Sequence, residues 1–154
     1  MRIVEDDLRS PAVAELLREH VDGMLTLSPA HSVHTMDLEA LRSADVSFWT
    51  AWDGEKLLGC GALKEMNPDH AEIKSMRTAK SHLGKGVATA ILQHMIVEAR
   101  NRGYLRLSLE TGSAAAFVPA HALYQKFGFD FCEPFGDYQE DPHSKFMTLA
   151  LRAE

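Results

Sequence analysis

The most constraining feature of the sequence is a glycine-rich turn between a predicted strand and a long amphipathic helix, within residues 71–102. Gly84 and Gly86 stand just before the helix, with Lys85 between them. The first amide groups of a helix have no partner inside the helix and carry partial positive charge. Glycine allows a ligand to approach the backbone closely. The turn therefore predicts a binding site for a phosphate or pyrophosphate group.

The helix after this turn is predicted over 85–102, lying on a β-sheet. Apolar residues recur on one face of it at helical spacing, with a stripe of Val87, Ile91, Met95 and Ala99. Strands predicted at 71–78 and 105–110 flank the helix in sequence. A strand, a helix and a second strand in this order form a crossover, so the two strands should run parallel.

The rest of the chain supplies further elements of the same sheet. Ser10 and Pro11 predict the start of a helix that ends near residue 26, and Asp37 is the expected cap of a second short helix. Asp53 and Gly54 predict a hairpin turn. Further strands are predicted at 1–5, 45–52, 56–65, 129–134 and 146–151. A further helix is predicted at 119–128. The order β-α-α-β-β-β-α-β-α-β-β predicts an α/β fold, an α+β mixed sheet with helices on both faces.

Length and charge limit the class of protein. A chain of 154 residues suits one domain, and we assign 1–154 to it. The net charge of −6 argues against nucleic acid as the main partner. Two cysteines form neither a disulfide framework nor a zinc set. No signal peptide and no membrane span are expected, and the predicted compartment is the cytoplasm.

Two pairs of residues have a functional and a structural interpretation. His31 and His34 could form a metal pair, but no further ligand lies nearby in sequence, so we expect a solvated lid loop over 27–36 and no metal. Trp49 and Trp52 could shape an acceptor pocket, although packing against the sheet is the favoured interpretation.

Two segments of the chain together resemble a known family. Residues 73–88 are similar to a strand followed by a pyrophosphate turn of the form R/Q-x-x-G-x-G/A, and Gly86 and Ala88 fill its end. Residues 122–129, ALYQKFGF, are similar to the helix signature A/x-L-Y-x-K-x-G-F. Two such motifs in the right order are more specific than either alone. Over about residues 45–151, the chain resembles the GNAT superfamily of N-acetyltransferases.

Three positions depart from the pattern of that family. Leu83 stands where the family usually has Arg or Gln, Phe117 where it often has Asn, and Thr78 where it normally has Val. These changes leave the backbone amides of the turn intact. The grip on pyrophosphate is therefore expected to rest on backbone N–H groups and on the charge of Lys85.

The resemblance implies an acyl-CoA-dependent N-acetyltransferase that moves an acetyl group from acetyl-CoA to a primary amine of a small molecule or amino acid. Acetyl-CoA is the implied cosubstrate. The turn would hold its pyrophosphate, and the strand before the turn would bond its pantetheine arm through the backbone. The residues implied in this binding are Met76, Arg77, Thr78, Leu83, Gly84, Lys85, Gly86, Val87, Ala88 and Thr89.

The implied reaction needs a base for the amine and an acid for the leaving thiolate. Glu72 is the first candidate base, with pairing to Lys74 as its structural alternative, and Glu110 is the second. Both are expected to face the crevice at the carboxyl ends of the strands. Tyr124, in the helix signature, is the implied acid near the sulfur atom.

A second function class stays open beside the enzyme. A GNAT-fold module that binds acyl-CoA as a sensor or structural unit, without turnover, would also fit Leu83 and an unsettled base. The acceptor would be set by the loops 27–36 and 136–145, whose acids could attract a cationic amine. The resemblance also makes a homodimer possible.

Overall fold

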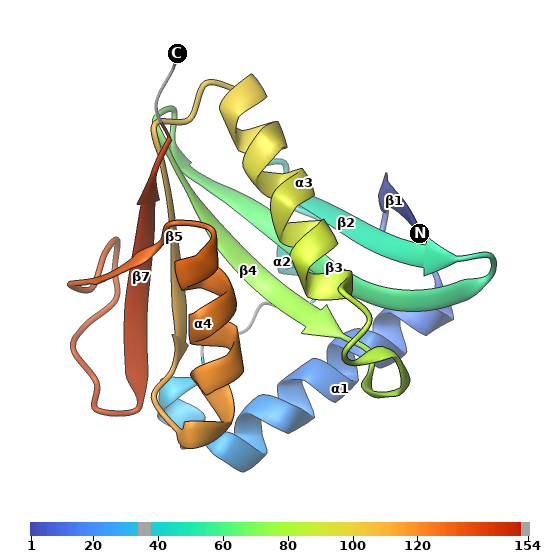
Figure 1. The fold of residues 1–154 in the computed structure, drawn as a ribbon, viewed down its shortest axis with the longest axis horizontal. Helices are drawn as coiled ribbons and strands as arrows, with labels where there is room; N and C mark the ends of the chain where they lie inside the picture. The colour runs from blue at the N-terminus through green and yellow to red at the C-terminus, as the bar shows by residue number, and fades with distance from the viewer. Residues whose placement is uncertain (34–37, 152–154) are drawn as a thin grey trace.

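The computed structural model describes residues 1–33 and 38–151. They form a seven-stranded mixed sheet of order β1-β2-β3-β4-β5-β7-β6 (Figure 1). The predicted cap Asp37 and the predicted loop residue His34 lie outside the described residues. The strands are β1 (Arg2–Glu5), β2 (Val46–Asp53), β3 (Lys56–Asn67), β4 (His70–Thr78), β5 (Arg106–Gly112), β6 (Asp130–Cys132) and β7 (Ser144–Ala150).

In the described parts of the chain, four α-helices cover the two faces of this sheet. They are α1 (Pro11–Leu27), α2 (Leu38–Leu41), α3 (Val87–Asn101) and α4 (Val118–Lys126). Apolar residues of α3 and α4 pack on one face, and those of α1 and α2 pack on the other (Figure 1). Three 3₁₀ turns precede α2, α3 and α4, at Ala30–Ser32, Lys80–His82 and Ala115–Phe117. Among the described residues, no helix is long and apolar enough to span a bilayer.

The predicted order of elements is confirmed, and the main differences lie at element ends. The long helix begins at Val87 rather than at residue 85, because Gly86 before it has φ +79° and is left-handed. The strand expected at 129–134 is reduced to Asp130–Cys132. The antiparallel pairing of this strand with β7 is confirmed, and β7 also pairs with β5.

The strands β4 and β5 separate at the centre of the sheet. They pair in parallel over His70–Ile73 and Arg106–Leu109, while both strands continue further along the chain. An irregularity of β4 against β3 accompanies this separation, and Ser75 within it has φ +55°. A β-bulge of this kind bends its strand and re-aims the side chains beside it. The gap that results is the place where a ligand can enter between two strands.

Gly61 on β3 faces this irregular part of β4. A Cβ atom at Gly61 would lie 2.8 Å from the sulfur of Met76 and 2.9 Å from Ile91 Cγ2. Only a glycine therefore fits at this position without displacing its neighbours. Trp49 is 3% exposed and its ring lies 5.6 Å from that of His94 on α3, as the packing interpretation expected.

Candidate active site

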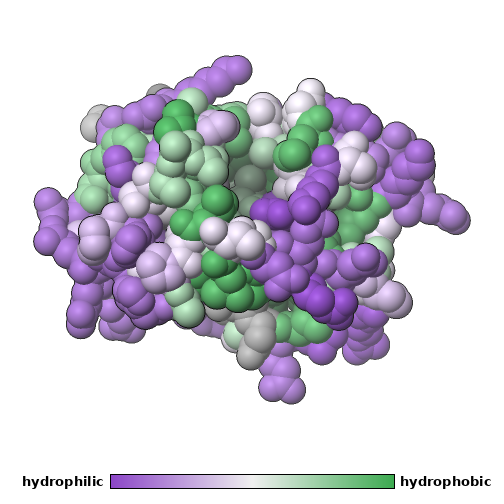
Figure 2. Space-filling model, turned by 90° about the horizontal axis from the view of Figure 1, so that it is seen from below, coloured by the Kyte–Doolittle hydropathy of each residue, from purple (hydrophilic) through white to green (hydrophobic). Residues whose placement is uncertain are grey.

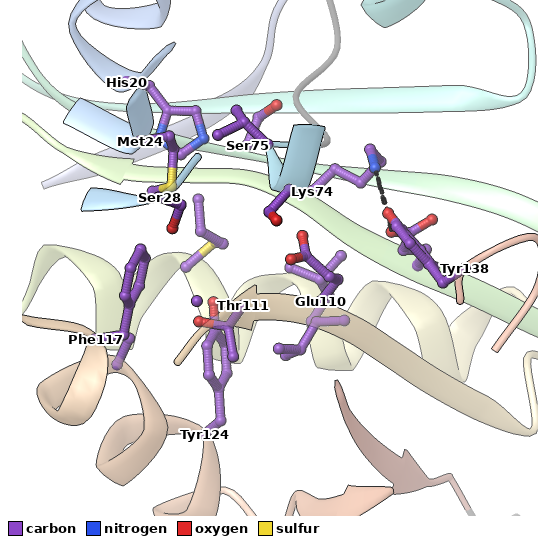
Figure 3. Close-up of a pocket in the computed structure, with 18 residues that line it drawn as sticks. His20, Met24, Ser28, Lys74, Ser75, Glu110, Thr111, Phe117, Tyr124 and Tyr138 are labelled. Atoms are coloured by element: carbon purple, nitrogen blue, oxygen red, sulfur yellow. Dashed lines mark hydrogen bonds and ion pairs between the residues drawn. The ribbon is translucent and has the colours of Figure 1, made fainter. Parts of the chain in front are cut away.

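A cavity of about 130 Å³ lies where β4 and β5 separate. Its walls come from α1, β4, β5, α4 and the two connecting loops near residues 32 and 138 (Figure 3). Seen from the lower end of the sheet, the molecular surface is hollowed near its middle, with apolar residues around the hollow and hydrophilic residues outside it (Figure 2). Among the predicted site residues, Glu72, Met76, Glu110 and Tyr124 line this cavity.

The glycine turn has the backbone geometry that a bound anion requires. Gly84 and Gly86 have φ of +77° and +79°, and a Cβ atom at either position would meet nothing within 4 Å. No side chain caps the first turn of α3, so the amide groups of Val87, Ala88 and Thr89 are left for a ligand or water.

Basic side chains surround this turn. The Nζ atom of Lys85 lies 3.0 Å from Nδ1 of His82, and Lys80 is part of the same 3₁₀ turn. Leu83, where the family pattern has a polar residue, is 65% exposed. The sequence analysis did not predict His82 and Lys80 as part of this site. Their position just before the glycines could have indicated them.

In the predicted pantetheine-binding segment of β4, side chains contact other parts of the protein, and Met76 also lines the cavity. Arg77 forms an ion pair with Glu19 of α1, with NH2 3.4 Å from Oε1, and Met76 packs toward Gly61 and α3. Thr78 pairs with Gly59 of β3 through the backbone. The expected contact of this segment with pantetheine through its backbone stays a prediction.

Glu110 is a half-buried carboxyl on β5 that points into the cavity (Figure 3). Burial raises the pKa of Glu110 to about 7, because the charged form loses solvation. The Ser144 hydroxyl and the Lys74 ammonium oppose this pKa shift, while the carboxylates of Glu72 and Asp141 add to it. A group that titrates near neutral pH can take and release a proton under ordinary conditions.

Glu72 on β4 is 6% exposed and is held by two partners. Its Oε2 accepts hydrogen bonds from the Tyr138 hydroxyl at 2.5 Å and from Lys74 Nζ at 3.2 Å. Lys74 Nζ also donates to the Tyr138 hydroxyl at 3.0 Å (Figure 3). Glu72 is therefore paired with Lys74, as its structural alternative predicted. Tyr138, from the loop before β7, belongs to the same hydrogen-bond network.

Tyr124 on α4 brings its hydroxyl to the cavity wall opposite α1 (Figure 3). The residue is 7% exposed, and its ring packs edge-on against Phe129 at 5.6 Å between ring centres. Burial raises the pKa of Tyr124, so the hydroxyl keeps its proton at neutral pH. Phe117, at the position where the family often has Asn, lines the same wall.

The two loops expected to select an acceptor contact each other over the cavity. Ser32 Oγ donates a hydrogen bond of 2.5 Å to Asp141 Oδ2, and His31 Nε2 lies 4.0 Å from the same oxygen. A second cavity of about 1010 Å³ lies beside the first and shares Glu72, Lys74 and Tyr138 with it. These contacts join segments more than 100 residues apart, which sequence reasoning did not resolve.

His20 on α1 also lines the first cavity and was not predicted. Burial and the charge of Arg77 lower the pKa of His20 to about 4. The available signal was its spacing, because Val13, Leu16 and Leu17 lead to position 20 on the same helix face. Within the described residues, no three His, Cys, Asp or Glu side chains converge as metal ligands.

The chain is similar to known proteins over nearly its whole length. The uncharacterized N-acetyltransferase YsnE of Bacillus subtilis (strain 168) is 57% identical over 151 residues, covering 98% of this chain and 100% of the relative. The uncharacterized N-acetyltransferase YedL of Escherichia coli (strain K12) is 51% identical over 149 residues, covering 97% and 94%. A solved Bacillus subtilis acetyltransferase in complex with CoA has a TM-score of 0.70 at 20% identity, covering 98% and 99%.

The match extends to a model of a whole family. Residues 13–129 fit the model described as the acetyltransferase (GNAT) family, a range that runs from α1 through the helix signature to Phe129. It includes both the glycine turn and Tyr124. The relatives cover nearly all of the chain, and their similarity is not confined to one motif. The chain therefore belongs to the acetyltransferase (GNAT) family.

Proposed function

We propose that this N-acetyltransferase uses acetyl-CoA as its donor and acetylates a primary amine of a small molecule or amino acid. The observation that carries the proposal is one cavity that joins Glu110 and Tyr124 at the separation of β4 and β5. A group with a pKa of about 7 and a protonated tyrosine are the base and the acid that amine acetylation needs.

Acetyl-CoA would bind across the end of the separated strands. The amide groups at the start of α3 and the charge of Lys85 would hold the pyrophosphate. The pantetheine arm would add to the edge of β4 along Met76 and Thr78, where pairing with β5 has ended. The thioester would then lie next to Ser75 and Tyr124, where a backbone N–H of β4 could polarise its carbonyl.

The proposed reaction is a direct transfer. The nitrogen of the amine attacks the thioester carbon, and the carbon–sulfur bond breaks as the amide bond forms. Glu110 takes the proton that the amine loses, directly or through water, and Tyr124 gives a proton or hydrogen bond to the departing CoA thiolate. The products are the acetylated amine and CoA with a free thiol.

Glu110 suits the role of base better than Glu72 does. A base is most effective when its pKa lies near the working pH, which is the case for Glu110. Glu72 already accepts hydrogen bonds from Lys74 and Tyr138, so its Oε2 atom is engaged within the protein. We therefore assign to Glu72 the positioning of Lys74 and Tyr138 between the two cavities.

Release of free thiol from acetyl-CoA tests the proposal. The acceptor panel contains L-lysine, spermidine, kanamycin and an alanine tripeptide, and acetyl-CoA binding is measured separately by calorimetry. We expect at least one amine to raise thiol release above the rate without an acceptor. Tight acetyl-CoA binding with no amine-dependent release would favour an acyl-CoA sensor, whereas failure to bind acetyl-CoA would contradict both readings.

A further inference from the structure

One buried residue at the cavity has a polar side chain where the helix pattern calls for an apolar one. The inner face of α1 buries Val13, Leu16, Leu17 and His20. These positions follow the spacing i, i+3, i+4 and i+7, which places all four on the same side of the helix. Three of them are ordinary core residues, and His20 is the one that reaches the cavity between β4 and β5.

The imidazole of His20 is not satisfied by the protein. The residue is 7% exposed, and its Nδ1 atom is buried without a hydrogen-bond partner in the part of the chain that the structure describes. Buried polar side chains nearly always have a partner, because an unpaired buried nitrogen costs free energy. Since His20 lines the cavity, a ligand bound there can supply a hydrogen-bonding partner for this imidazole.

The surroundings of His20 keep its ring uncharged. Arg77 lies close enough to oppose a second positive charge, and the Arg77 guanidinium is itself anchored to Glu19 at 3.4 Å. A neutral imidazole has one nitrogen that donates a hydrogen bond and one that accepts. It can therefore accept an N–H without competing for the proton that the reaction releases.

We propose that His20 is an acceptor-binding residue, whose uncharged imidazole accepts a hydrogen bond from the amine that is to be acetylated. This inference rests on the proposed function. Figure 3 shows His20 on the α1 side of the cavity, while Glu110, Thr111 and Tyr124 come from the opposite wall. An amine between these walls gives one proton to Glu110 and keeps another N–H on His20, which directs its lone pair toward the thioester.

The proposed contact would also favour amines over alcohols as acceptors. An amine carries enough hydrogens to serve both Glu110 and His20, whereas an alcohol has a single hydrogen and can serve only one of them. Both His20, on the α1 side of the cavity, and the base Glu110 would then contribute to the selection of nitrogen over oxygen acceptors.

The test compares His20→Leu and His20→Gln with wild type, using whichever of L-lysine, spermidine, kanamycin or the alanine tripeptide gives the highest kcat/KM. Leucine fills the site without a polar atom, so we expect KM for the amine to rise about tenfold, the value of one hydrogen bond, with kcat little changed. Glutamine restores a polar group and should recover part of this loss. Acetyl-CoA affinity and thermal stability should not fall in either variant.

Leu17→Met is the matched control, because it changes a core residue of the same α1 face that does not line the cavity. Its KM should equal that of wild type. An unchanged KM in His20→Leu, equal defects in the Leu and Gln variants, or weakened acetyl-CoA binding would each overturn the assignment. A wild type without amine-dependent thiol release would overturn the proposed function together with it, so the two failures are distinct.

Discussion

At the scale of single residues, the two candidate carboxylates differ in what surrounds them. Glu72 is held by an ammonium and a phenol, whereas burial dominates at Glu110. The same residue type is therefore held in two ways, since Glu72 is paired within the protein while burial raises the pKa of Glu110 to about 7. Sequence alone does not distinguish the two carboxylates, because each lies within one of two adjacent strands whose residues alternate in the same way.

The role of Glu110 predicts a specific dependence of rate on pH. Because its pKa is about 7, kcat/KM of the wild type should rise with pH below that value and level off above it. Glu110→Gln should lower kcat about 100-fold and remove this inflection. Steady-state rates between pH 5.5 and 9 measure both effects. Glu72→Gln serves as the comparison and should keep the inflection, and an inflection that survives in Glu110→Gln would contradict the assignment.

Tyr124 allows an equally direct test of the acid. Removal of its hydroxyl in Tyr124→Phe should lower kcat about tenfold, roughly 1.4 kcal/mol of barrier, while acetyl-CoA binds as before. Tyr104→Phe is a matched control, because the Tyr104 hydroxyl donates to Glu65 at 2.6 Å and does not line the cavity. Turnover and calorimetric affinity are measured for both variants. Equal kcat values for Tyr124→Phe and wild type would exclude the acid role.

At the scale of elements, the site depends on how β4 ends and how α3 begins. The irregularity at Ser75 separates β4 from β5, and the left-handed Gly86 starts α3 with its amide groups exposed to a ligand. In the proposed function, the gap at the first element would take the thioester, and the start of the second would take the phosphates. The sequence predicted the second feature from its glycines, but not the first.

A valine at Gly86 should weaken acetyl-CoA binding, because its side chain would occupy the space that the pyrophosphate needs. We expect the dissociation constant to rise at least about tenfold, which is 1.4 kcal/mol. Gly54→Val in the β2–β3 hairpin is a matched control, since Gly54 also has positive φ and open space around its Cβ position. Both variants bear similar backbone strain, so calorimetry isolates the loss of binding. An equal affinity in the two variants would remove the turn from the binding site.

At the scale of the whole molecule, the parts that could be predicted are those encoded locally. Helical spacing in α3, the turn at Asp53–Gly54 and the glycines at 84 and 86 each depend on near neighbours in sequence, and each was found. Other features form only when distant segments meet. The bond from Tyr138 to Glu72 joins residues 66 positions apart, and the bond from Ser32 to Asp141 joins residues 109 positions apart. Such pairs have no local pattern in the sequence, so the contacts between the loops around the cavity could not be predicted.

The free energy of unfolding of the whole domain should depend on pH because of the titration of Glu110. Its pKa is about 7 in the folded chain and near the ordinary glutamate value of 4.5 in the unfolded chain. Between these values the unfolded state is ionised while the folded state still holds the proton, so the free energy of unfolding falls as pH rises. Above the folded pKa this contribution is constant, and below 4.5 it is absent.

Urea unfolding of wild type and Glu110→Gln between pH 4.5 and 8.5 measures this contribution. The wild type should lose stability relative to the Gln variant through this range up to about pH 7 and no further, whereas a difference independent of pH would mean that Glu110 titrates alike in both states.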